Sequence, residues 1–348
     1  MWYDFAEMYG RELIDLSTQG KRVIIYLLLL STALALTSCG GSNNPRPISE
    51  TRLLLDTVCT VTLYDPPDRA MLEEALDLCA EFEEMFSRTI EGSDVWRINH
   101  AGGAPVAVSG HTIDIIRSAL EFGSFSGGCF DITIGRLCAL WDFSGDPAVP
   151  SVNALAEARA TVGFRGVNID GGTVRLENPQ TWLDLGGIAK GYIADRLADF
   201  LRGRGVKSAL IDLGGNIVTV GMKHGGEPWR IGVNDPFGGR SAIIGSIGVG
   251  EASLVTSGIY ERQFTEDGVT YHHIIDPETG MPAESDVASV TIVSEISFIG
   301  DALSTIAILL GSEKTLEFLA SFPGVMGAVL VLRSGEIVQF GDIDFAAA

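Results

Sequence analysis

The segment "DLGGIAKG" (residues 184–191) places an acidic residue, two glycines and a lysine where a strand is expected to give way to a helix. Glycines at a helix start leave backbone N–H groups open to a phosphate, and the helix dipole favours its negative charge. Asp184 ends the strand, and Lys190 lies within the first turns of the helix. The same residues also fit a tight strand–helix turn with a solvated lysine. The spacing matches neither a GxGxxG nucleotide loop nor a P-loop, which sets those two binding modes aside. The segment alone therefore does not decide between a phosphate site and a simple strand–helix turn.

A second segment, "DALST" (residues 301–305), carries a carboxylate and a hydroxyl on one predicted helix face. Asp301 and Thr305 are four residues apart, and such positions are neighbours on a helix surface. A carboxylate and a hydroxyl with carbonyls nearby suit a hard cation such as Mg²⁺. Alternatively, Asp301 only complements the helix dipole and Thr305 packs. The sequence pattern is compatible with either role.

Two further segments combine glycine or proline with a residue that could contact a ligand. In "YHHIIDPETGMP" (residues 271–282), His272 and His273 point to opposite faces of a strand, so at most one faces a site. A histidine beside such a turn could act as a general acid or base, or could be an ordinary edge-strand residue. In "SGGCFDITIG" (residues 126–135), Phe130 could stack on a planar ring, or the glycines could soften a loop over the core.

The elements that must position these segments do not alternate regularly between helix and strand. This excludes a doubly wound parallel sheet and favours an α+β fold with substantial antiparallel sheet. We expect one strand over residues 51–65 and helices over 68–87, 109–128, 151–163 and 299–312. We also expect a hairpin around Gly171–Gly172, a strand over 207–221, an antiparallel meander over 229–282, a strand over 287–295 and a closing hairpin over 327–342.

The N-terminal residues have the pattern of an export signal. Lys21 and Arg22 precede an apolar stretch, residues 23–36, that is shorter than the roughly 20 residues of a membrane span. It ends in "LTSCG", which is similar to the lipobox of bacterial lipoproteins, where the cysteine is lipidated. We therefore predict an extension and signal peptide over residues 1–38, a polar tether over 39–50 and one domain over 51–345. The predicted location is the extracytoplasmic membrane face, with a lipid on Cys39; an ordinary signal peptide or an uncleaved anchor is the alternative.

Charge and cysteine content narrow the function classes. The formal net charge of −21 is not offset by any basic run, which argues against nucleic acid or an anionic membrane surface as partner. A protein this acidic needs local positive charge to handle phosphates. No CxxC pair occurs among the other cysteines, Cys59, Cys79, Cys129 and Cys138, so their spacing does not indicate a metal site. We expect buried thiols, with disulfides as the alternative.

Taken together and in order, these segments resemble the ApbE family of exported flavin transferases. The resemblance runs from "LLLDTVCTVTLYD" to "IGDALSTIAILLG" and includes "FSRTIEGSDVWRIN", "LIDLGGNIVTVG", "WRIGVNDP" and "VTSGIYERQF". It implies a mixed, largely antiparallel sheet with flanking helices and two closely joined subdomains. It also implies a Mg²⁺-dependent FAD:protein FMN transferase, which splits the FAD pyrophosphate, joins FMN by a phosphoester to a Thr or Ser of a target protein and releases AMP.

The resemblance also implies roles for individual residues. The Mg²⁺ ligands would be Asp301, Thr305 and the main-chain carbonyl of Gly187, and His273 or Asp301 would help to deprotonate the incoming hydroxyl. The implied FAD contacts are Leu55, Thr89, Cys129, Phe130, Asp131, Asp184, Lys190, His273 and Ile274. Three places depart from the common family pattern. This chain has Leu55-Asp56-Thr57 where the family often has Met-Gly-Thr, Thr89 where an aromatic residue is common, and Cys129 where alanine is commoner. The change at Thr89 removes a stacking contact.

Two other functions share this site. Water in place of the protein hydroxyl would give a Mg²⁺-dependent FAD pyrophosphatase that forms FMN and AMP. A non-catalytic flavin-binding lipoprotein would need only the FAD contacts. The presence of all four of the residues Lys190, His273, Asp301 and Thr305 argues against it, because binding alone does not require that set. The expected partners are FAD, a flavoprotein subunit with an acceptor Thr or Ser, such as one from a membrane electron-transport complex, and the membrane itself through the lipid on Cys39.

Overall fold

The structure, a computed structural model, describes residues 46–143, 145–223, 225–239 and 242–348. The described residues, 46 to 348, belong to one compact unit. The predicted signal peptide and Cys39 lie outside the described residues. Strand β1 begins at Ile48, three residues before the predicted domain start at residue 51. No helix in the described part is both long and apolar enough to span a membrane.

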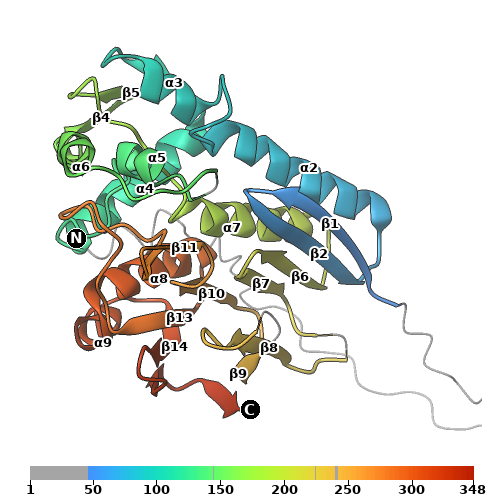
Figure 1. The fold of residues 1–348 in the computed structure, drawn as a ribbon. Coiled ribbons are helices and arrows are strands. Elements are labelled where there is room, and N and C mark those ends of the chain that lie inside the picture. Colours follow the sequence, from blue (N-terminus) through green and yellow to red (C-terminus); the bar gives the residue numbers. More distant parts are fainter. Residues whose placement is uncertain (1–45, 144, 224, 240–241) are drawn as a thin grey trace, which may run out of the picture. The chain divides into compact units, whose positions relative to one another are not determined.

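The centre of the unit is an antiparallel sheet whose strands come from both ends of the chain (Figure 1). All of its neighbouring strands pair antiparallel, which confirms the predicted α+β class. In sheet order the strands are β1 (Ile48–Leu54), β2 (Thr57–Asp65), β6 (Ser208–Leu213), β7 (Asn216–Val220), β10 (Ser253–Gly258), β13 (Val287–Ser294), β14 (Val325–Leu332) and β15 (Ile337–Gly341).

Helices α2 (Arg69–Phe86), α7 (Ala189–Gly203) and α8 (Ser297–Leu310) pack on this sheet and on one another. The predicted apolar stripe of α2 is buried, and Asp68 caps its first N–H groups. Helix α8 packs against β10 and β13, where Gly300 lies against the side chain of Val255. Because side chains alternate along a strand, Leu254 points to the opposite face of the sheet.

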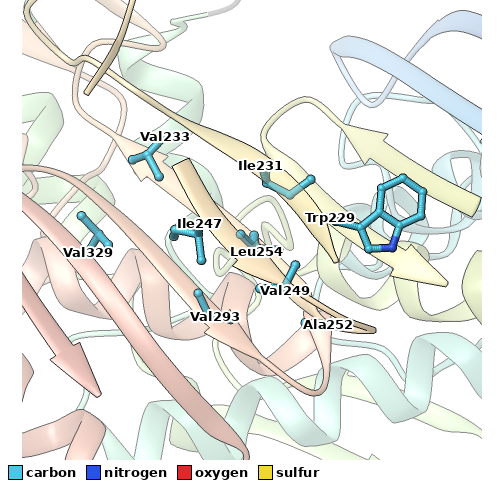
Figure 2. Close-up of a cluster of buried hydrophobic side chains, with 9 residues drawn as sticks. All are labelled: Trp229, Ile231, Val233, Ile247, Val249, Ala252, Leu254, Val293 and Val329. Atoms are coloured by element: carbon cyan, nitrogen blue, oxygen red, sulfur yellow. The ribbon is translucent and has the colours of Figure 1, made fainter. Parts of the chain in front are cut away.

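That opposite face is covered by a smaller sheet of β8 (Trp229–Asn234), β9 (Ile243–Val249) and β16 (Asp344–Ala347). Side chains of β8 and β9 pack there against Leu254, Val293 and Val329 of the large sheet (Figure 2). β8 alternates strictly between buried and exposed residues, as expected for a strand with one face on a core. The central strands of the large sheet are therefore buried on both faces, and every residue of β13 is buried; the edge strands β1 and β15 keep exposed residues.

Apart from α9 (Ser312–Ala320), which packs on α8 and β14, the remaining elements lie around the "SGGCFDITIG" loop. They are α3 (Asp94–His100), β3 (Val106–Ala107), α4 (Gly110–Phe125), α5 (Gly135–Trp141), α6 (Val152–Arg159), the 3₁₀ turn η1 (Phe164–Gly166), β4 (Val167–Asp170), β5 (Thr173–Leu176), and the hairpin β11 (Gln263–Glu266) with β12 (Val269–His272). The predicted N-cap Ser109 accepts a hydrogen bond from Thr112 N. The hairpin around Gly171–Gly172 is also confirmed.

Three predictions about strands were wrong. Residues 207–221, predicted as one strand, form the antiparallel hairpin of β6 and β7, because Gly214 and Gly215 both adopt positive φ and turn the chain between them. Residues 51–65 form the hairpin β1–β2 instead of one strand, because Leu55 and Asp56 both adopt positive φ (56° and 55°). The amide of Leu55 donates to Glu83 Oε1 of α2 at 2.7 Å, which supports the turn. The predicted meander over 229–282 is divided among three sheets: β8 and β9 pair with each other, β10 joins the large sheet, and β11 pairs with β12.

Candidate active site

Helices α7 and α8 cross closely because a glycine stands at their contact. A Cβ on Gly191 would lie 2.5 Å from Ser297 O and 2.8 Å from Phe298 Cα. One turn further along α7, the Asp195 carboxylate accepts the backbone N–H groups of Ser297 and Phe298, each at 2.9 Å. Ile296, the N-cap of α8, has no side chain able to do this, so α7 supplies the cap. Burial raises the pKa of Asp195 to about 6, against the effect of these two hydrogen bonds.

This crossing places Asp301 of α8 at the N-terminus of α7. Its Oδ2 accepts the Gly191 N–H at 2.8 Å, and its Oδ1 lies 3.6 Å from Lys190 Nζ. The Asp301 side chain is 2% exposed, whereas that of Lys190 is 28% exposed. An N–H of the first helical turn has no partner within its own helix, so the carboxylate also complements the helix dipole. "DLGGIAKG" and "DALST", far apart in sequence, are thus in direct contact.

Thr305 completes this group. Its Oγ1 lies 3.5 Å from the position that a Cβ on Gly187 would occupy, so the hydroxyl and the Gly187 backbone are neighbours. The three predicted metal ligands, Gly187, Asp301 and Thr305, therefore lie together. The described residues contain no cluster of three or more His, Cys, Asp or Glu residues able to hold a metal. One carboxylate with neutral oxygens fits Mg²⁺, which commonly binds through one or two carboxylates, waters and substrate phosphates.

Asp184 contacts a different cation. Its Oδ2 accepts Arg88 Nε at 2.6 Å, and its Oδ1 accepts the Gly186 N–H at 2.7 Å. The thiol of Cys138 is a further neighbour: burial and the charge of Asp184 raise the pKa of Cys138 well above its usual range. The predicted FAD contact is therefore held by a salt bridge between "FSRT" and "DLGG". Sequence reasoning missed Arg88, although it lies within the quoted "FSRT" segment.

The "CFD" loop is held by its own aspartate. Asp131 accepts Thr133 N and Thr133 Oγ1 with one oxygen and Phe164 N with the other. The Phe130 ring is 5% exposed, and its Cε2 lies 3.2 Å from the Gly187 Cβ position. In this structure Phe130 packs against the glycine turn, and no open ring face for stacking is seen. The loop and the "DPETG" turn share a cavity of about 390 Å³, lined from the loop by residues 126–129 and 131 and from the turn by residues 276–278.

The two histidines differ as predicted. His272 is 4% exposed, and its Nε2 donates to Ala283 O at 3.1 Å. His273 pairs with Arg262: the carbonyl of Arg262 accepts both the backbone N–H of His273 at 3.1 Å and its Nδ1–H at 3.3 Å. Because a carbonyl only accepts, Nδ1 carries the proton, and Nε2 is left as the basic nitrogen. Burial and the positive charge of Arg262 lower the pKa of His273 to about 3, so the ring is neutral at pH 7.

Arg262 links this histidine to the first motif, since its Nη2 donates to Asp56 O at 3.2 Å. Its neighbour Glu261 was also missed by sequence reasoning. That residue as a whole is exposed, but desolvation of its carboxylate raises its pKa to about 7; Lys190 and Arg262 oppose the shift, and Asp301 adds to it. Oε1 of Glu261 lies 3.7 Å from the position that a Cβ on Gly215 would occupy. The signal in the sequence was the segment "VTSGIYERQF", which carries the family resemblance but for which no site residue was predicted.

The other predicted FAD contacts lie at the borders of these groups. Leu55 is half-buried in the β1–β2 turn beside the Asp56 carbonyl, and Ile274 is 6% exposed next to His273. Thr89 is exposed, and its hydroxyl shares a hydrogen bond with Ser87 Oγ at 3.0 Å, next to Arg88. The second "DLGG" (residues 212–215) forms the β6–β7 turn, and Gly214 lies against Thr57. The four described cysteines are free thiols; Cys59 and Cys79 are buried, as expected, whereas Cys129 and Cys138 are half-buried.

Comparisons with known proteins place this chain in a family. The pattern of the ApbE family matches residues 55–330. The FAD:protein FMN transferase of Treponema pallidum is 40% identical over 309 residues, covering 83% of this chain and 85% of that protein. A protein of the same name from Klebsiella pneumoniae is 36% identical over 298 residues, covering 84% of this chain and 92% of its own.

Solved structures give the same result. The ApbE protein of Thermotoga maritima superposes with a TM-score of 0.79 at 34% identity, covering 85% of this chain and 97% of its own. The flavin transferase ApbE of Vibrio cholerae gives 0.75 at 27% identity, covering 87% of this chain and 97% of its own. The match extends through every segment that builds the α7–α8 site. This chain is a member of the ApbE family.

Proposed function

We propose that this chain is a Mg²⁺-dependent FAD:protein FMN transferase that cleaves the FAD pyrophosphate, attaches FMN to a Thr or Ser of a target flavoprotein and releases AMP. The main support is that four residues lie together at the start of α7: Gly187, Lys190, Asp301 and Thr305. In addition, relatives of this chain are named FAD:protein FMN transferases. A helix N-terminus with a lysine suits a diphosphate.

The chemistry is a phosphoryl-type transfer. The acceptor hydroxyl attacks the phosphorus on the flavin side, its O–P bond forms, and the anhydride P–O bond breaks as AMP departs with the bridging oxygen. Positioning and charge neutralisation supply most of the rate in such reactions. Asp301, Thr305 and the Gly187 carbonyl would hold Mg²⁺, which when bound offsets negative charge on the phosphate oxygens. Lys190 is placed to neutralise the same charge, because its Nζ lies 3.6 Å from Asp301.

Proton transfer from the acceptor hydroxyl falls to His273. Asp301 was the alternative, but its oxygens already face the Gly191 N–H and Lys190. His273 is neutral at pH 7 and has its Nδ1–H held by the Arg262 carbonyl, so Nε2 can accept a proton. Its low pKa keeps it in the basic form under all physiological conditions, although it also makes the ring a weak base.

The test is incubation of the chain with FAD, Mg²⁺ and a purified flavin-carrying subunit of a membrane electron-transport complex, followed by intact-mass measurement. The expected result is a covalent FMN increment on the subunit together with free AMP. FMN and AMP without labelling would instead indicate FAD hydrolysis. Intact FAD would refute both enzymatic functions.

A matched pair of variants tests the metal ligands. Asp301→Ala should abolish Mg²⁺-dependent turnover while the folded state persists, as judged by circular dichroism. Thr305→Val should lower turnover at limiting Mg²⁺. Thr305→Ser keeps the hydroxyl and should turn over like wild type. Full activity of Asp301→Ala, or equal activity of the two Thr305 variants, would contradict the ligand assignment.

We further propose that the chain is exported and lipid-anchored at Cys39. The support is the apolar stretch of residues 23–36 followed by "LTSCG". Replacement of Cys39 by Ser should move the protein from the membrane fraction to the soluble fraction and remove the lipid mass from its N-terminal peptide. Unchanged membrane association of that variant would refute the anchor.

A further inference from the structure

The hairpin β11–β12 has one strand edge that faces a groove. In an antiparallel pair, residues alternate between those whose main-chain groups bond the partner strand and those whose groups point away from it. His273 N donates to Arg262 O, and His272 pairs with Gln263 in register, so His272 is an outward-pointing residue. By the same alternation Thr270 also presents its N–H and C=O away from β11.

The segment that should pair with this edge diverges from it. After the "DPETG" turn the chain returns antiparallel: Asp276 N donates to Met281 O and Ala283 N to Ile274 O. In that register the next pair would join His272 to Ser285. No main-chain bond between these two residues occurs; instead the His272 ring donates to Ala283 O, and Asp286 O accepts the N–H of Arg333 on the far side. The ladder therefore stops at Ile274 and Ala283, and all four residues of β12 lie beyond it.

The space left between them is a groove of about 400 Å³. It is lined by Val269 to His272 on one wall, by Met281 to Ser285 on the other, and by Arg333. Tyr271 and Met281 belong to the aromatic cluster around Trp141, which gives the groove an apolar side fixed to the core. Glu284 and Arg333 supply charges of both signs at its border. His273, the proposed base, directly follows His272 at the end of the β12 wall.

We propose that this groove binds an extended segment of the acceptor protein by adding it as a strand to the free edge of β12. This rests on the proposed function, in which the acceptor is a polypeptide that must reach His273. Strand addition uses main-chain hydrogen bonds for affinity and pockets for alternate side chains for specificity. The open groups are a donor and an acceptor from each of Thr270 and His272, which match a peptide backbone and not an anion such as phosphate.

The hairpin itself offers a matched pair of variants. Thr270→Pro removes the N–H that faces the groove and no bond to β11. Thr265→Pro removes the equivalent outward N–H on the opposite edge, because Thr265 is paired with Thr270 in register. Both variants also delete one member of the same hydroxyl contact, Thr265 Oγ1 to Thr270 Oγ1 at 3.0 Å. Any general effect on the hairpin is therefore common to the two, and neither residue belongs to the FAD site.

The experiment measures transfer of FMN to the purified electron-transport subunit, FAD affinity, and binding of that subunit without FAD. Thr270→Pro should lower kcat/KM for the subunit about tenfold or more, through KM, and weaken its binding similarly; FAD affinity should not change. Thr265→Pro should behave as wild type. Equal effects of the two prolines, or wild-type binding by Thr270→Pro, would overturn the proposal. Weakened binding with no FMN transfer by the wild-type chain would support the groove while refuting the transferase function.

Discussion

Substitution of Gly191 by alanine tests whether the α7–α8 crossing holds the site together. In an exposed helix position this change stabilises by about 1 kcal/mol, because glycine is a poor helix former. Here the added Cβ would lie 2.5 Å from Ser297 O, 2.7 Å from Asp301 Cβ and 2.8 Å from Phe298 Cα. These atoms are backbone or directly attached to it, so no side-chain rotation relieves the contact, and the helices must separate.

The expected cost has two parts. Overpacking costs about 1–3 kcal/mol, and loss of the Gly191 N–H bond to the Asp301 carboxylate costs a further ~1.5–3 kcal/mol. Set against the gain in helix propensity of about 1 kcal/mol, the net destabilisation is about 1.5–5 kcal/mol. For a unit of this size that corresponds to a melting temperature roughly 2–8 °C lower. Because Asp301 moves with α8, we also expect turnover to need more Mg²⁺.

Gly203, at the other end of α7, is the matched control. It has no heavy atom within 4 Å of its Cβ position and no positive φ, so Gly203→Ala should be neutral or slightly stabilising. Chemical denaturation and a Mg²⁺ titration of FAD cleavage measure both effects. A Gly191→Ala protein as stable as wild type would refute the packing argument. Lower stability with an unchanged Mg²⁺ requirement would refute the link between the crossing and the metal site.

Two other predictions concern buried ionisable groups. Asp195→Asn replaces one of the two carboxylate oxygens that accept N–H groups at the start of α8. It should lower the free energy of unfolding by about 1.5–3 kcal/mol, measured by urea unfolding above pH 6. The control is Asp199→Asn at an exposed position of α7, which should change stability by less than about 0.5 kcal/mol. A change as large at Asp199 would contradict the capping role. Burial lowers the pKa of His272 to about 4, so the folded state resists a proton that the unfolded state takes up near pH 6.5. Stability is therefore lost as pH falls from 6.5 towards 4, and wild type should lose about 2 kcal/mol more than His272→Gln between pH 6.5 and 5. Parallel pH profiles of the two proteins would contradict this.

Local patterns predicted most elements of this fold. The apolar stripe of α2, the Ser109 cap and the glycine-centred hairpin all depend on residues close in sequence, and all are confirmed. The β1–β2 hairpin was missed because its turn uses positive φ at Leu55 and Asp56, without the glycine or asparagine that usually signals such a turn. Its support comes from Glu83, a residue of the next helix.

The site was predictable only as separate segments. Nothing local to "DALST" indicates that Asp301 will accept the Gly191 N–H, since that contact depends on how α7 and α8 cross. The same holds for Arg88 on Asp184 and for the Arg262 carbonyl on His273, each joining positions distant in sequence. Family resemblance connected the segments, whereas the physical reasons for their proximity, Gly191 and Asp195, emerge from tertiary packing.

The net charge of −21 makes the local arrangement around α7 functionally informative. A pyrophosphate approaching so acidic a protein needs compensation at the point of contact, and the helix start offers the dipole of α7, Lys190 and the proposed cation site. Asp301 accepts the Gly191 N–H with one oxygen and faces Lys190 with the other. A single carboxylate can therefore cap α7 and still contribute to a cation site. Gly191 and Gly187 allow that carboxylate and Thr305 to approach the main chain, so the glycines of "DLGGIAKG" serve close packing between two helices as much as contact with a phosphate.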